Sequence, residues 1–131
     1  MPVNTRRWTA RILTGLSVAF LLFDATIKVL QAAPAIKGTV ELGFPPDVVL
    51  GIGLLQLACL VLYIVPRTSF LGAVLLTGYL GGAVASHVRV GNPLFSHTLF
   101  PTYVAAMLWG GLYLRDARLR SLLSASPAPA A

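Results

Sequence analysis

The sequence LTGYLGGAVASHVRVGNP, residues 76–93, has the composition of a glycine-rich membrane helix that ends in a small polar cluster. Glycine and alanine leave little side chain between Tyr79 and His87, so we expect neighbouring helix backbones to approach this segment closely. His87 and Arg89 follow where the helix is expected to leave the bilayer. The rest of the chain supplies three more apolar segments, which we expect to gather around this helix.

The composition is that of a membrane protein. Of the 131 residues, 56% are hydrophobic and 11% are charged, whereas charged residues make up roughly a quarter of a soluble domain. The formal net charge is +6, but the basic residues flank apolar segments and are not interleaved with exposed aromatic residues, which argues against nucleic-acid binding. The single cysteine, Cys59, excludes an intramolecular disulfide and a CxxC redox pair.

Four apolar segments predict an all-α fold with one domain over residues 1–117. We expect membrane-spanning helices at about residues 10–33, 48–65, 70–88 and 98–115, because about 20 apolar residues cross the hydrocarbon core. Short connections make consecutive helices antiparallel neighbours, so the expected architecture is an up-down-up-down four-helix bundle.

Two segments outside these helices have a different composition. Residues 34–47 contain several prolines and glycines together with charged residues, and they predict an exposed loop. Residues 118–131 end in ASPAPAA and predict a disordered cytoplasmic tail.

A cleavable signal sequence is an alternative for the first segment. Residues 5–7, TRR, are weakly similar to a twin-arginine signal, and residues 33–35, APA, to a signal-peptidase site. Asp24, Lys28 and Gln31 lie between the most apolar part of the segment and that site. Their position favours a helix that stays in the membrane.

The distribution of basic residues predicts the orientation in the membrane. The opposite side of the membrane from the termini holds Lys37 and Arg89, with Lys28 as a third if its side chain extends to that surface. Seven basic residues share the side of the two termini: Arg6, Arg7, Arg11, Arg67, Arg115, Arg118 and Arg120. Because cytoplasmic segments carry the excess of Lys and Arg, both termini are expected in the cytoplasm.

Asp24 and Lys28 are charged residues inside the first apolar segment. They are four residues apart, so they share one helix face and can pair. Asp24 lies roughly 20 Å along the axis from Arg11, too deep to reach either surface easily, and an aspartate there costs about 2.5–3.5 kcal/mol. We therefore expect the pair either to fix helix packing or to form the polar floor of a ligand pocket.

His87 is expected at a depth similar to that of Lys28. It is a candidate to join Asp24 and Lys28 in a constellation open to the outside, with Arg89 and Glu41 as rim charges. A histidine there titrates near neutral pH and can transfer protons. The alternative is an interfacial histidine bonded to a loop carbonyl. Metal binding by His87 together with the second histidine and a nearby carboxylate has no supporting ligand spacing.

Gln56 and Tyr79 are expected near the middle of the membrane, on the second and third helices. Gln56 is predicted to join helices through its amide. The hydroxyl of Tyr79 needs a partner, for which Gln56 and Asp24 are the candidates.

The chain resembles the DoxX-like family of small bacterial four-helix membrane proteins. Residues 66–95, PRTSFLGAVLLTGYLGGAVASHVRVGNPLF, and 100–116, FPTYVAAMLWGGLYLRD, carry the resemblance, and residues 21–30, LLFDATIKVL, and 50–68, LGIGLLQLACLVLYIVPRT, extend it. The resemblance implies a multi-pass protein of the bacterial inner membrane. The positions that match the family's recurrent polar pattern are Asp24, Lys28, Gln56, Tyr79, His87 and Arg89, and no catalytic role comes with them.

Three hypotheses of function follow. The family takes its name from a subunit linked to quinone-dependent sulfur oxidation, so the first is a binding or redox-accessory protein that holds a quinone-like lipophile on these six residues. The second is a structural or assembly subunit of a membrane redox complex, bound to a partner protein or to its own copies, with no ligand of its own. The third is a lipid-modifying enzyme that uses Asp24 and His87 as acid and base.

Overall fold

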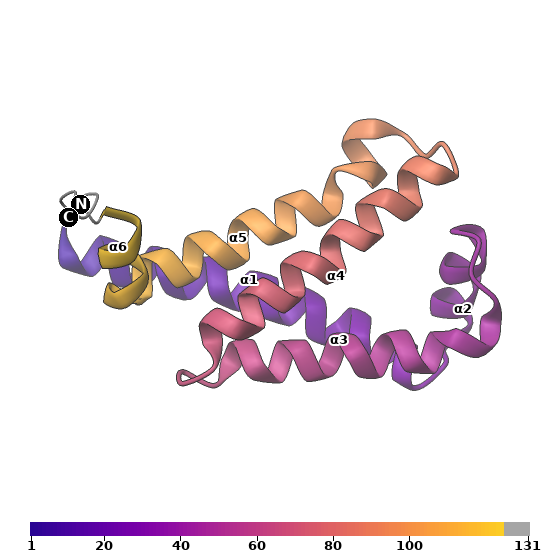
Figure 1. Cartoon of the computed structure of the whole chain (residues 1–131), viewed down its shortest axis with the longest axis horizontal. Helices are drawn as coiled ribbons and strands as arrows, with labels where there is room; N and C mark the ends of the chain where they lie inside the picture. Colours follow the sequence, from indigo (N-terminus) through magenta and orange to yellow (C-terminus); the bar gives the residue numbers. More distant parts are fainter. Residues whose placement is uncertain (125–131) are drawn as a thin grey trace, which may run out of the picture.

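The computed structural model describes residues 1–124, and these residues form helices and connections without a strand (Figure 1). The elements in chain order are α1 (Val3–Val29), α2 (Ala33–Glu41), η1 (Pro46–Val48), α3 (Val49–Ile64), α4 (Ser69–Arg89), η2 (Leu94–Thr98), α5 (Phe100–Arg115) and α6 (Ala117–Ser124). The prediction of an all-helical chain is therefore confirmed.

The long helices contact one another in a closed ring. Helix α1 packs against α3 and α5, and α4 also packs against α3 and α5. In Figure 1, α6 lies at the end of the molecule that holds the N-terminus, and α2 and η2 lie toward the opposite end. The short elements therefore extend the two ends of the group of long helices.

Three helical segments among residues 1–124 are long and apolar enough to cross a membrane. They are Val3–Val29, Pro46–Ile64 and Ser69–Arg89. Most of their residues are not covered by the rest of the chain, and many large hydrophobic side chains on them are exposed. Such a surface is stable in lipid and not in water, so the chain is an integral membrane protein.

The connection after α1 differs from the predicted exposed loop. Residues 33–41 form the helix α2, which starts with Pro34 in its first turn, where the missing N–H group costs nothing. The hydroxyl of Thr39 donates a hydrogen bond to the carbonyl of Ala35 at 2.8 Å, so this polar side chain is satisfied where it is buried. Gly43, at φ +93°, turns the chain away after the helix.

The C-terminal segment differs in the same way, because α6 (Ala117–Ser124) covers residues 118–124, where a disordered tail is predicted. The carboxylate of Asp116 accepts a hydrogen bond from the backbone N–H of Arg118 at 2.9 Å and so caps the helix. Desolvation raises the pKa of Asp116, but the hydrogen bonds and charge of Arg118 outweigh it, and the net pKa lies below its usual value. The remaining part of the predicted tail, residues 125–131, lies outside the described residues.

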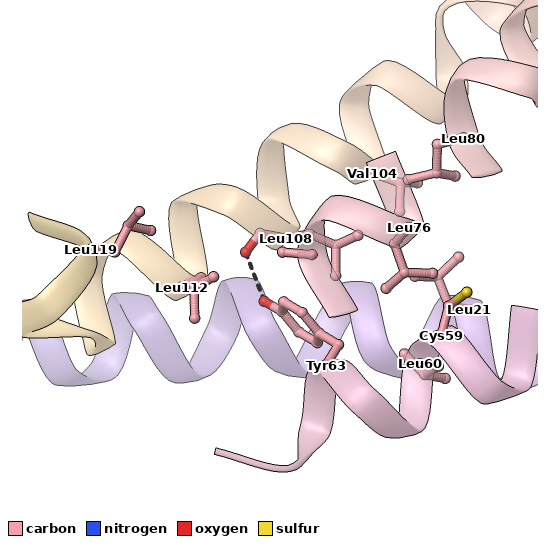
Figure 2. Packing of buried hydrophobic residues seen from close by; sticks show 11 residues of the cluster. Leu21, Cys59, Leu60, Tyr63, Leu76, Leu80, Val104, Leu108, Leu112 and Leu119 are labelled. Carbon is pink, nitrogen blue, oxygen red and sulfur yellow. Dashed lines mark hydrogen bonds between the residues drawn. The ribbon is translucent and has the colours of Figure 1, made fainter. Parts of the chain in front are cut away.

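A buried apolar cluster lies where the long helices meet (Figure 2). Tyr63 from α3 is fully buried, and its hydroxyl donates a hydrogen bond to the carbonyl of Leu108 on α5 at 2.7 Å. Leu119 brings α6 into the same cluster. Its other members are Leu21, Cys59, Leu60, Ala73, Leu76, Leu80, Val104 and Leu112.

The glycines that allow close helix contact are not those of residues 76–93. A Cβ atom on Gly72 would overlap the backbone of Tyr63, whereas Gly78, Gly81 and Gly82 have no atom of another element within 4 Å of a Cβ position. The prediction that neighbouring backbones of this chain approach the GYLGG segment is therefore wrong. Small residues let two helices come together only where a second helix lies opposite them, and α3 lies opposite Gly72.

Gly72→Ala tests this packing. We expect the free energy of unfolding to fall by about 1–3 kcal/mol, because the added methyl group forces α3 and α4 apart. Thermal unfolding in detergent micelles measures the loss. Gly78→Ala on the same helix is the control and should not lower stability, since its methyl group meets no neighbour. Equal stability of the two variants would contradict the packing described here.

Candidate functional site

Lys28 is the centre of a polar network between three helices. Its ammonium group donates to Asp24 Oδ2 at 2.5 Å, to Gln56 Oε1 at 3.0 Å and to the hydroxyl oxygen of Tyr79 at 2.9 Å. The predicted pairing of Asp24 with Lys28 is confirmed as an ion pair within α1. Gln56 comes from α3 and Tyr79 from α4, so one ammonium group joins three helices.

The partners of Lys28 also bond to one another. The hydroxyl of Tyr79 donates to Gln56 Oε1 at 2.7 Å, so of the two predicted candidates it is Gln56, and not Asp24, that accepts from this tyrosine. The amide nitrogen of Gln56 donates to the carbonyl of Leu21 at 3.1 Å, and Gln56 is fully buried. Because a buried polar group without a partner is costly, this mutual satisfaction stabilises the polar interior.

A glycine on α3 brings the network together. A Cβ atom on Gly53 would overlap Lys28 and the backbone of Val29, so α1 and α3 are in close contact beside the network. Gly53 lies three residues before Gln56, on the same face of α3. A larger residue at position 53 would push Lys28 away from Gln56.

A cavity of about 660 Å³ lies above this network. Asp24, Lys28 and Tyr79 form its polar floor. Apolar residues from α1, α3, α4 and α5 form most of the walls, and α2 closes one side. The apolar wall residues include Phe20, Ile27, Ile52, Leu55, Leu80, Phe100 and Val104. The lining residues of α2 are Pro34, Ala35, Gly38, Thr39 and Glu41, so Glu41, expected as a rim charge, does lie on the cavity lining.

Gly78 and Gly82 line the cavity, and this explains the glycine-rich segment of α4. With no atom of another element within 4 Å of their Cβ positions, these residues leave volume empty. Side chains at these two positions would project into that space. Gly81, between them in the sequence, does not line the cavity.

His87 lines the same cavity but does not join the network on its floor. Its Nδ1 accepts a hydrogen bond from the side-chain amide of Asn92 at 2.7 Å, and its ring lies 6.1 Å from that of His97, centroid to centroid. Asn92 and His97 also line the cavity. The neutral His87 ring therefore carries its proton on Nε2. Asn92, which the sequence did not single out, orients this histidine from the turn at Gly91.

Arg89 holds α2 in place. Its guanidinium donates to the carbonyl of Leu42 at 3.0 Å, and a Cβ atom on Gly43 would overlap the guanidinium. Leu42 and Phe44, on either side of Gly43, both line the cavity. Arg89 itself does not line it, and its contact fixes the segment that closes one side.

The structure thus divides the six predicted site residues into two groups. Asp24, Lys28, Tyr79 and His87 line one cavity, whereas Gln56 lies buried behind the floor and Arg89 braces α2. The part of the site that sequence reasoning missed is α2. The sequence pattern of α2 gives little indication of a helix, because short helices with proline and glycine nearby resemble loops in composition.

The comparisons with known proteins give one match. The family model described as the DoxX-like family matches residues 12–111, which include the whole floor of the cavity together with α2 and His87. No curated protein and no solved structure matches the chain.

Lys28→Met tests the network. We expect a loss of about 3–5 kcal/mol in stability, because Asp24 keeps its charge and loses its partner. The double variant Asp24→Leu/Lys28→Met removes both charges and should recover at least half of that loss. Thermal unfolding in detergent measures both variants. Lys37→Met, an exposed lysine on α2, is the control and should change stability by less than about 0.5 kcal/mol. A double variant no more stable than Lys28→Met would contradict the ion-pair account.

Proposed function

The chain belongs to the DoxX-like family, whose model matches residues 12–111, and from this premise we propose that this integral membrane protein holds a quinone-like lipophile in the cavity above Lys28. The observation that carries the proposal is the combination of cavity size and lining. Ligand cavities measure roughly 300–1,000 Å³ and have apolar walls with a few convergent polar groups. The cavity here, of about 660 Å³ with Asp24, Lys28 and Tyr79 on its floor, fits that description.

The predicted site residues take distinct roles in this proposal. Asp24, Tyr79 and His87 face the ligand, and Lys28 organises the floor. Gln56 supports Lys28 and Tyr79 from behind, and Arg89 keeps α2 against the ligand. The binding or accessory role needs no reaction at the site, and a quinone-linked oxidoreductase complex is the kind of assembly that such a protein would serve.

We further propose four membrane spans, α1, α3, α4 and α5, arranged up-down-up-down with both termini in the cytoplasm of a bacterial cell. The closed ring of contacts among these helices supports it. Helix α5 has 16 residues, about 24 Å, and spans with local thinning of the bilayer. The excess of arginine near the termini supports the orientation. The cavity then opens toward the outer leaflet.

An assembly subunit is a second candidate, and one observation favours it. Gly81 is exposed and has no neighbour within 4 Å of a Cβ position, so α4 offers a place where a helix of another chain can approach. This surface is separate from the cavity. The two functions are therefore distinguished by variants at neighbouring glycines.

Gly82→Leu and Gly81→Leu form that matched pair. Gly82→Leu should lower the affinity for decylubiquinone at least tenfold, because its side chain fills the cavity. Gly81→Leu should leave the affinity unchanged. Ligand-dependent thermal stabilisation of the purified protein measures both. If decylubiquinone does not stabilise the wild type, or if Gly82→Leu binds it normally, the ligand proposal is wrong. A loss of assembly in Gly81→Leu, seen as a smaller mass on size exclusion, would support the second candidate.

Cysteine labelling tests the proposed topology. In a Cys59→Ala background, Ser96→Cys on η2 should react with a membrane-impermeant maleimide in intact cells, and Ser121→Cys on α6 should react only after lysis. Both serines are exposed in the structure. A cysteine that is not labelled in intact cells therefore lies on the cytoplasmic side of the membrane, and burial of its side chain is not the reason. Labelling of both positions in intact cells would contradict four spans with cytoplasmic termini.

A further inference from the structure

On the floor of the cavity, each N–H bond of Lys28 already takes part in a hydrogen bond. A lysine ammonium group carries three N–H bonds, and these point to Asp24, Gln56 and Tyr79. The hydroxyl hydrogen of Tyr79 is used as well, because it donates to Gln56. A ligand group that can only accept hydrogen bonds, such as a carbonyl oxygen, therefore gains nothing from this floor.

Asp24 leaves an acceptor facing the cavity. The ammonium of Lys28 bonds to Oδ2, and within residues 1–124 no group donates a hydrogen bond to Oδ1. The side chain of Asp24 is 28% exposed and lines the cavity. A carboxylate oxygen in an apolar cavity needs a donor, and a bound ligand is in position to supply one.

The charges of Asp24 and Lys28 determine which kind of hydrogen-bond donor a ligand can place above the floor. Asp24 already has a cation at 2.5 Å, so the floor carries no net charge. Lys28 opposes the attraction of Asp24 for a second cation, and the further carboxylate on the cavity lining, Glu41, lies on α2 and not on the floor. A neutral hydroxyl group satisfies Oδ1 without adding charge, and a hydrogen bond to an ionised acceptor is stronger than one between neutral groups.

We propose that the cavity selects lipophiles whose head group donates a hydrogen bond, a phenol or hydroquinone hydroxyl, over the matching carbonyl or ether compounds. The hydroxyl donates to Asp24 Oδ1, and the apolar part lies against the walls of α1, α3 and α5. This inference rests on the proposed function, because it names the chemistry of the ligand in the same cavity. It makes the reduced member of a quinone pair the form that is held.

His87 is a competing donor on the cavity wall. With Nδ1 accepting from Asn92, its Nε2–H is available to a ligand carbonyl. A carbonyl compound bound at His87 would not depend on Asp24. Variants of the two residues therefore separate a ligand that binds on the floor from one that binds at His87.

The experiment compares three compounds of nearly the same shape on the full-length protein in lipid nanodiscs under argon: decylhydroquinone, the quinone formed from it by oxidation, and its dimethyl ether. We expect decylhydroquinone to bind the wild type about tenfold to a hundredfold more tightly than the other two, the value of one hydrogen bond to a charged group. Asp24→Asn turns an amide N–H toward the ligand and should reduce this preference to less than threefold. His87→Phe changes a residue that faces the ligand, so it should shift the affinities for all three compounds together and keep their ratio.

The outcomes separate this inference from the function on which it rests. If all three compounds bind with similar affinity, or if the quinone binds most tightly, the inference that the cavity selects hydrogen-bond donors is wrong. The proposal that the cavity holds a lipophile is then still supported. If none binds, the proposed function fails and this inference fails with it. The hydroquinone and the quinone differ by the two hydroxyl hydrogens, and the ether carries methyl groups in their place. The wild-type comparison of hydroquinone with quinone therefore decides the question even where Asp24→Asn does not fold. A preference that survives in Asp24→Asn and disappears in His87→Phe would move the selecting group to His87 and overturn the assignment to Asp24.

Discussion

The structure depends on the full satisfaction of one ammonium group, that of Lys28, at a largely buried position between the long helices. Lys28 has three N–H bonds and three acceptors, one each from α1, α3 and α4. Each of these partners would be costly alone in an apolar interior, and together they hold three helices in one register. The same contacts direct the free oxygen of Asp24 and the ring of Tyr79 toward the cavity, so the group that joins the helices also defines the floor.

Glycine serves two opposite purposes in the same group of helices. Gly53 and Gly72 lie where another helix would meet a side chain, and they permit close contact beside the network and beside Tyr63. Gly78 and Gly82 meet nothing, and they leave the volume that the apolar walls enclose. Close packing on the α3 side of α4 and empty space on the cavity side are therefore parts of one arrangement.

The short elements at one end complete the cavity. Helix α2 closes a side of it, and the contact between Arg89 and the carbonyl of Leu42 ties α2 to the end of α4. Asn92 orients His87 from the turn that follows α4. These contacts join segments that are up to 47 residues apart in the sequence, and each is made at the end of a helix. The walls and floor thus come from the long helices, and the enclosure comes from the connections.

Hydropathy determined the helical class, the membrane environment and the approximate bounds of the long helices, because lipid demands long apolar helices whatever their packing. The spacing of Asp24 and Lys28 likewise determined their pairing, which is local to one helix. The partner of Tyr79 was narrowed to two candidates, since a buried hydroxyl must be satisfied. Only the tertiary structure decided that Gly78 and Gly82 face empty volume instead of another backbone, that residues 33–41 form a helix over the cavity, and that His87 pairs with Asn92 and not with Asp24. These features depend on which surfaces lie opposite one another in space, and composition and periodicity describe only one helix at a time.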